Sequence, residues 1–216
     1  MSNNKYENKE ICSACGGRCC KKCGCDYFVT DFESMKIDYL ESVLDTGRVS
    51  VIAALDFKRV NNKMLLTPLL YLRARNINRN EIDLLSMKTT CASLREGGCY
   101  FSLDERPSGG SSLIPKENGF CEQSVDFLEE IKKWEPYQKV LSRLVKRRTG
   151  LSVDEKLRED SLKLFYDFIS ENFDNVSSSE IDEIRDLIPM LAQVYPKELI
   201  EATILLENNL PLKRRK

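Results

Sequence analysis

Residues 12–25 read Cys12-Ser-Ala-Cys15-Gly-Gly-Arg-Cys19-Cys20-Lys-Lys-Cys23-Gly-Cys25, and they hold six of the nine cysteines of the chain. Two cysteines separated by two residues can turn both sulfur atoms toward one metal ion. Neighbouring glycines let backbone amides approach those sulfurs as hydrogen-bond donors. Such a motif supplies half of a tetrahedral site, so the remaining ligands must come from elsewhere in the chain.

The three remaining cysteines lie far downstream, at Cys91, Cys99 and Cys121. They are the only distant thiols, so a metal would close the fold over long-range ligands and couple its binding to folding. Histidine is absent from the sequence, which removes the commonest nitrogen ligand and leaves sulfur as the main donor. The candidate ligands are therefore all nine cysteines: Cys12, Cys15, Cys19, Cys20, Cys23, Cys25, Cys91, Cys99 and Cys121.

The number of centres and the identity of the metal stay open at this point. Adjacent Cys19 and Cys20 do not suit one mononuclear ion, and they point to two centres or to a bridging thiolate. Nine thiols suffice for two four-sulfur sites, or for one iron–sulfur cluster and one zinc ion. Arg18, Lys21 and Lys22 either offset the charge of a thiolate centre or are ordinary surface charges.

The composition favours a reduced compartment. The polar N-terminus lacks the apolar core of a secretory signal, and no run reaches the roughly 20 apolar residues of a membrane span. We therefore expect a cytoplasmic protein without a membrane partner, in which clustered cysteines bind metal. A disulfide framework and a thioredoxin-like pair at Cys12 and Cys15 are the less favoured alternatives. The net charge of −1 gives no argument for a nucleic-acid partner.

The apolar pattern predicts an α+β fold, and the absence of cysteines after Cys121 predicts a domain boundary after residue 123. Residues 1–123 form a small cysteine-rich metal-binding domain with a helix and short hairpins. The helix is expected to begin at the capping-box pair Thr30 and Glu33 and to end at Gly47. Its apolar stripe comprises Phe32, Met35, Tyr39, Leu40 and Val43.

Alternating apolar residues from Val49 to Phe57, the turn pair Asn61-Asn62 and the apolar run 64–72 predict a β-hairpin. Pro68 is expected to place the second strand at a sheet edge or to shorten it, because proline cannot donate to the ladder. Gly97-Gly98 predicts a second tight turn between Cys91 and Cys99.

Residues 124–216 are predicted to form a C-terminal helical region, which offers a surface for a protein or peptide partner. Pro136 breaks the first helical run or opens a new one, and Pro196 begins the last helix, which runs through Ile200 and Ile204. The stripes expected to face inward are Val125, Leu128, Ile131 and Trp134, then Leu157, Leu164, Phe165, Phe168 and Ile169 within 154–173, then Ile181, Ile184, Leu187, Ile188 and Leu191 after Ser179.

The cysteine pattern also resembles a known family. The resemblance is carried by Cys12, Cys15, Cys19 and Cys20, by Cys91-Ala-Ser-Leu94, Gly98-Cys99-Tyr-Phe and Glu105-Arg106-Pro107, and by Cys121. Together these motifs resemble the zinc- or iron-chelating cysteine-cluster (YkgJ-like) family, and they span residues 12–123. The resemblance implies a metal-binding domain, and because one branch of the family comprises flagellin lysine-N-methylases, it also allows an S-adenosylmethionine-dependent enzyme that modifies a protein or peptide.

The chain departs from the family pattern in two places. The cysteine usual after the arginine–proline pair is replaced by Ser108-Gly109-Gly110, and the last thiol is delayed to Cys121. Cys23 and Cys25 are additional, and we expect them to substitute for the displaced ligand. Arg106 either donates to a cluster sulfur or pins its loop. The sequence does not decide whether the protein is an enzyme, and a zinc-braced interaction module is a third hypothesis.

Overall fold

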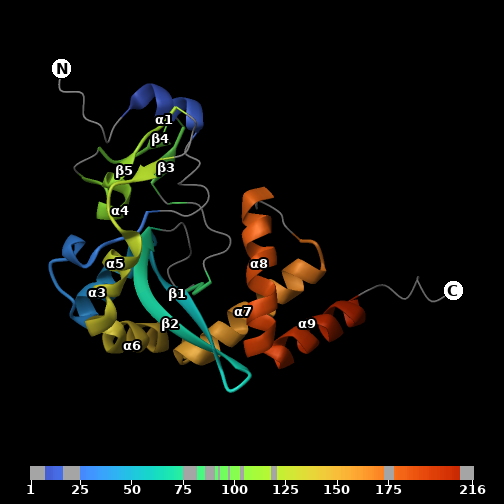
Figure 1. The fold of residues 1–216 in the computed structure, drawn as a ribbon. Helices are drawn as coiled ribbons and strands as arrows, with labels where there is room; N and C mark the ends of the chain where they lie inside the picture. Colours follow the sequence, from blue (N-terminus) through green and yellow to red (C-terminus); the bar gives the residue numbers. More distant parts are fainter. Residues whose placement is uncertain are drawn as a thin grey trace. The chain divides into compact units, whose positions relative to one another are not determined.

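The computed structural model describes residues 8–16, 25–74, 82–85, 91, 93–96, 98–102, 105–117, 121–172 and 178–209 (Figure 1). In this part of the chain helices and two-stranded antiparallel sheets occur together, so the mixed α and β composition is confirmed. Two compact units are formed, Met1–Ala54 with Leu69–Gly150 and Leu55–Pro68 with Leu151–Lys216. The boundary predicted after residue 123 stays a prediction.

The predicted hairpin is confirmed as β1 (Val49–Val60) and β2 (Lys63–Ala74), which pair with each other. Asn61 and Asn62 have φ angles of 48° and 62°, the left-handed region that a two-residue hairpin turn requires and that asparagine tolerates. At the start of β1, residues 49–52 are buried on both faces, and partly buried residues alternate with exposed ones only from residue 55 to residue 58.

Pro68 lies within β2, which is an edge strand of a two-stranded sheet, so the first of the two predicted alternatives is confirmed and the strand is not shortened. A two-residue turn directs the backbone groups of odd-numbered β2 residues toward β1 and those of even-numbered residues outward. The outward contacts of Leu70, Leu72 and Ala74 agree with this register. Because Pro68 falls on the outer edge, its missing N–H removes no bond between the strands.

The outer edge of β2 is completed by groups that are distant in sequence. Leu70 N donates to Gln138 Oε1 at 2.8 Å, and Gln138 Nε2 donates to Leu70 O at 2.8 Å, so one side-chain amide pairs as a neighbouring strand would. Further along, Tyr27 N donates to Leu72 O at 2.9 Å and Ala74 N donates to Cys25 O at 2.7 Å. These contacts satisfy an edge that would otherwise be open to further pairing.

Helix α3 (Ile37–Asp45) begins later than predicted. Val29–Asp31 forms a short 3-10 turn, η1, and the Thr30–Glu33 capping box is not formed. The reason lies in Asp31, whose carboxylate accepts from Phe28 N at 2.8 Å and from Ser108 N at 3.0 Å and thereby fixes the chain in a turn. Gly47, with a φ of 68°, follows the helix end as expected.

Helix α5 (Phe127–Lys132), the 3-10 turn η3 (Glu135–Tyr137) and α6 (Gln138–Thr149) follow one another, with Pro136 opening the turn. Ile131 and Trp134 are fully buried as predicted. Leu128 was predicted to face inward, but it is 65% exposed. Asp126 caps α5 by accepting from Leu128 N, so this leucine lies in the first turn, on the solvent side.

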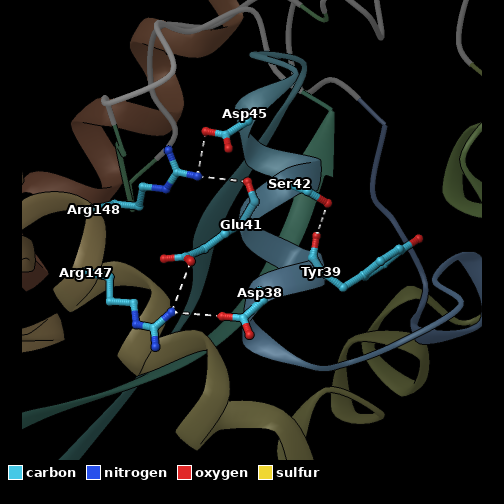
Figure 2. A network of polar contacts seen from close by, with 7 residues as sticks. All are labelled: Asp38, Tyr39, Glu41, Ser42, Asp45, Arg147 and Arg148. Atoms are coloured by element: carbon cyan, nitrogen blue, oxygen red, sulfur yellow. Dashed lines mark hydrogen bonds and ion pairs between the residues drawn. The ribbon is translucent and has the colours of Figure 1, made fainter.

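An ion-pair network joins α3 to α6 (Figure 2). Arg147 Nη1 lies 3.0 Å from Glu41 Oε2 and 3.3 Å from Asp38 Oδ1. Arg148 Nη2 lies 2.8 Å from Asp45 Oδ1 and donates to Glu41 O at 2.8 Å. Arg147 is half exposed, so its pairs contribute little to stability, whereas the partly buried Arg148 satisfies a carbonyl near the end of α3.

The second unit contains α7 (Val153–Ile169), α8 (Ser178–Val194) and α9 (Pro196–Asn209), as well as the tip of the hairpin. Ser152 and Glu155 form a capping box at the start of α7. The predicted end of this helix at Phe173 lies outside the described residues, and α7 ends at Ile169. No helix in the described part of the chain is both long and apolar enough to span a bilayer.

Most of the predicted inward stripe of this unit is buried, including Leu157, Leu164, Phe165, Ile184, Ile188 and Leu191. Arg59 Nη2 in the hairpin tip donates to Gln193 Oε1 of α8 at 3.0 Å. The last helix begins at Pro196 as predicted, but Ile200 and Ile204 lie on its exposed face, while Ala202 is fully buried.

Replacing Gln138 by alanine is expected to destabilise the fold by about 1–3 kcal/mol, because the N–H and C=O of buried Leu70 lose their partner. The free energy of unfolding from urea denaturation measures the effect. Gln193→Ala is the matched control, since it removes an amide whose hydrogen bonds are exposed. Equal effects of the two substitutions would contradict the role given to Gln138.

Burial raises the pKa of Tyr195 to about 12, and the nearby carboxylate of Asp154 adds to the shift. The neutral phenol therefore stabilises the fold fully below pH 10, and this contribution is lost as the pH rises from 10 toward 12. Tyr195→Phe is expected to reduce the loss of unfolding free energy between about pH 9 and about pH 11 by about 1 kcal/mol. A loss that Tyr195→Phe leaves unchanged would contradict the role given to this buried phenol.

Candidate functional site

Six of the nine predicted ligands lie in the described part of the chain, all in the first unit. Cys12 and Cys15 belong to α1 (Lys9–Cys15), and Cys99 ends β4 (Gly98–Cys99). The others are Cys25, which precedes the β-bridge of Asp26, Cys91, which precedes β3 (Leu94–Arg95), and Cys121, which precedes β6 (Glu122–Gln123). Cys19, Cys20 and Cys23 lie outside the described residues.

Cys25 and Cys91 share one buried cluster with Ala74, although they are far apart in the sequence. Only 7% of Cys25 and 4% of Cys91 is exposed. Tyr27 and Leu94 pack against the same cluster. The structure thus brings one thiol of the N-terminal motif together with one of the three distant thiols.

The β3–β4 hairpin places Cys99 next to this cluster. Leu94 pairs with Cys99 in the antiparallel register, and directly opposed residues project their side chains to the same face of a sheet. Leu94 N also donates to Cys91 O at 3.1 Å, which fixes the hairpin to the buried cysteine. Of the tight turn predicted at Gly97-Gly98, Gly97 lies outside the described residues, and Gly98 pairs with Arg95.

Helix α1 contacts β4, so the helix that bears Cys12 and Cys15 lies beside the strand that bears Cys99 (Figure 1). Asn8 caps the helix by accepting from Ile11 N, and Gly16 ends it with a φ of 63°. The two cysteines of the Cys-x-x-Cys pair are both partly exposed.

Cys121 enters through a third short hairpin, in which β5 (Leu113–Ile114) pairs with β6. It is partly exposed, and the chain leads back from its hairpin to α4 (Ser108–Ser111), where Ser124 N donates to Ser112 O at 3.0 Å. The short helix α4 in turn lies against Cys25.

The two glycines of α4 allow this close approach. A β-carbon on Gly110 would lie 2.7 Å from Cys25 Sγ, and one on Gly109 would lie 2.5 Å from the carbonyl oxygen of Asp26. Gly109 N donates to that oxygen at 3.0 Å. The family pattern usually has a cysteine where this chain has Ser108-Gly109-Gly110. The backbone of this segment therefore packs against the sulfur of Cys25.

Asp31 holds the loop before α4 in place. Its carboxylate accepts from Ser108 N at 3.0 Å and from the hydroxyl of Ser108. Arg106 Nε donates to Phe101 O at 3.3 Å, a contact within the loop that agrees with the pinning role considered for this arginine.

A partly buried ion pair fixes Cys25 from the opposite side. The carboxylate of Asp26 pairs with the guanidinium of Arg73, and the two side chains are 13% and 15% exposed. Arg73 Nη2 donates to the hydroxyl of Tyr71 at 2.6 Å, and the guanidinium lies 5.4 Å from the centre of that ring. Successive side chains of an extended segment point to opposite faces, so Arg73 acts on Cys25 through the backbone of Asp26.

The thiols of Cys25 and Cys91 lie among mostly apolar side chains. Burial raises the pKa of Tyr27 to about 12, with Cys91, Cys25 and Asp31 adding to the shift and Arg48 opposing it. The phenol therefore stays protonated at neutral pH. Ionising two thiols in such a cluster costs free energy unless a cation offsets their charge.

Thiolates are suitable ligands for a thiophilic metal, and the structure brings two of the predicted ligands into one cluster. No group of three cysteine, aspartate or glutamate side chains close enough to hold an ion occurs among the residues that the structure describes. Cys25 and Cys91 share a buried cluster, and Leu94, which packs against it, is the cross-strand partner of Cys99. We call the pair Cys25 and Cys91 the candidate half-site.

Spacing along the sequence did not reveal the residues that position the half-site. These residues act through contacts between segments that are distant in the chain, and they are Asp26, Arg73, Gly109 and Gly110. The one local signal was the pair of adjacent glycines, which is typical of a turn but also of close backbone approach.

Comparison with known proteins gives no match: no family model, no curated protein and no solved structure matches the chain. The resemblance to the cysteine-cluster family therefore rests on the motifs quoted above.

Replacing Arg73 by methionine is expected to expose Cys25 selectively, because Asp26 loses the ion pair that holds the adjacent backbone. In reduced, metal-free protein, the rate at which iodoacetamide alkylates Cys25 should rise at least about tenfold relative to the rate at Cys91, as read by peptide mass spectrometry.

Arg158→Met provides the matched control. Arg158 also pairs with a carboxylate, at 2.8 Å from Asp154 Oδ2, and lies over a tyrosine ring, but it belongs to the second unit. The compared quantity is the ratio of the alkylation rate at Cys25 to the rate at Cys91. If Arg73→Met and Arg158→Met changed this ratio equally, Arg73 would have a general stabilising role rather than a local one.

Proposed function

We propose that the chain is a metal-binding protein of the cysteine-cluster type, in which thiolates hold zinc or an iron–sulfur cluster. The observation that carries the proposal is the shared buried cluster of Cys25 and Cys91. One thiol comes from the cysteine-rich segment and the other from the distant set, which is the long-range pairing that a folded thiolate site requires.

Further ligands would come from the elements around this half-site. Cys99 is the cross-strand partner of Leu94, which packs on the cluster, and α1 brings Cys12 and Cys15 to the strand of Cys99. These three thiols are partly exposed, whereas Cys25 and Cys91 are buried. The buried pair would form the inner side of a centre and the others its outer side.

The competing interpretation treats Cys25 and Cys91 as small apolar core residues. The metal interpretation is favoured by nine cysteines in a chain without histidine. It is also favoured by Cys99 on β4, opposite Leu94, and by Cys12 and Cys15 on α1, which contacts β4. Zinc bound by four thiolates would be structural because no coordination position remains for water, whereas an iron–sulfur cluster would supply electron transfer. The protein residues would orient the sulfurs and exclude water from the inner pair.

Protein purified without oxygen is expected to contain stoichiometric zinc or iron by elemental analysis, and visible absorbance separates the two metals. Cys25→Ser and Cys91→Ser should each lower the metal affinity at least about 100-fold, because each removes a buried thiolate and leaves its partner charged. Competition with a chromophoric chelator measures this affinity.

Ala74→Ser is the matched control, because it places a hydroxyl in the same buried cluster and retains both thiols. It should keep its metal despite a comparable loss of stability. A reduced, folded wild-type protein that is metal-free and unaffected by chelators would refute the proposal.

A further inference from the structure

Helix α9 has one face buried and an opposite face that is also partly apolar. Its inward side is marked by Ala202, which is fully buried, and the helix packs on α7 and α8 within the second unit (Figure 1). Ile200 and Ile204 are 60% and 50% exposed, and at 100° per residue they lie on the side opposite Ala202. A helix that is apolar on both faces is expected to be covered on both.

Charged residues flank these isoleucines at helical spacing. Lys197 lies three residues before Ile200, and Glu207 lies three residues after Ile204, so the four side chains form one stripe along the exposed face. We call Lys197, Ile200, Ile204 and Glu207 the outer stripe. Neither Lys197 nor Glu207 makes a side-chain hydrogen bond or ion pair with any residue that the structure describes.

The order of charges along the outer stripe is self-complementary. When two copies of α9 pack antiparallel about a two-fold axis opposite residue 202, Ile200 faces Ile204 of the other copy. The same axis places Lys197 of each copy opposite Glu207 of the other copy, which gives two lysine–glutamate pairs. A symmetric dimer requires this kind of surface, on which each patch matches itself after rotation.

We propose that the outer stripe of α9 is the interface of a symmetric homodimer of this chain. Two facing isoleucine pairs form its apolar centre, and two lysine–glutamate pairs close its ends. One pair of helices of about four turns buries less than the roughly 1,600 Å² of a standard stable interface, so we expect a dissociation constant in the micromolar range. The dimer is independent of the metal proposal, because α9 and all the described cysteines belong to different units.

Sedimentation equilibrium of the full chain from about 1 to about 200 µM tests the proposal. The wild type should shift from monomer to dimer over this range. Ile204→Glu should weaken association at least about tenfold, because it places charge at the apolar centre. Leu65→Glu is the matched control, since Leu65 is 49% exposed in the same unit but lies outside the stripe, and it should leave association unchanged.

A charge swap tests the antiparallel geometry itself. Lys197→Glu and Glu207→Lys should each weaken the dimer, because each places like charges opposite one another, and the double variant should restore it. Circular dichroism verifies that each variant is folded.

A wild type that stays monomeric over the whole range overturns the proposal, as does a dimer that Ile204→Glu leaves intact. A double charge swap as weak as the single ones also overturns it. If the protein dimerised only after removal of residues 210–216, these residues would be what covers the outer stripe in the full chain, and the proposal would again fail.

Discussion

Two backbone hydrogen bonds join residues 25–27 to the end of β2, and the candidate site is arranged around them. Ala74 donates to the carbonyl of Cys25 and Tyr27 donates to that of Leu72, so Cys25 is held as part of a sheet edge rather than as part of a loop. The same segment carries Asp26, whose carbonyl oxygen accepts from Gly109 N and whose carboxylate pairs with Arg73. These backbone bonds hold the thiol of Cys25 at a buried position.

Charge and polarity are separated across this segment. The Asp26–Arg73 pair lies on one face of the extended chain, and the cluster of Cys25, Cys91 and Ala74 lies on the other. The ion pair keeps its own hydrogen bond to Tyr71 and leaves the thiol face apolar. An apolar environment disfavours ionised thiols whose charge is not neutralised. A bound cation would neutralise them, so such an environment favours two buried thiolates only when a metal is bound.

Local patterns in the sequence predicted the elements that are stabilised locally. The hairpin followed from the alternation before Asn61-Asn62, and α7 and α8 followed from the spacing of their apolar residues. The start of α3 was predicted wrongly because a distant group intervened: Asp31 binds the backbone of Ser108 and fixes a turn where the helix was expected. The sequence placed Pro68 at a sheet edge, but it did not reveal that Gln138 completes this edge. At the site, residue chemistry selected the cysteines, whereas the adjacency of Cys25 and Cys91 and the role of Arg73 depend on contacts that no spacing encodes. The contributions of Cys19, Cys20 and Cys23 stay predictions.

The contact between α4 and Cys25 has a consequence for how this chain can evolve. Glycine weakens a helix by about 1 kcal/mol relative to alanine, and α4 contains two of them in a single turn. Drift toward alanine would strengthen that turn in isolation, yet every side chain at position 110 would press on the sulfur of Cys25. Selection at this position therefore acts against local helix stability for as long as the thiol is retained, and loss of the thiol would release the constraint.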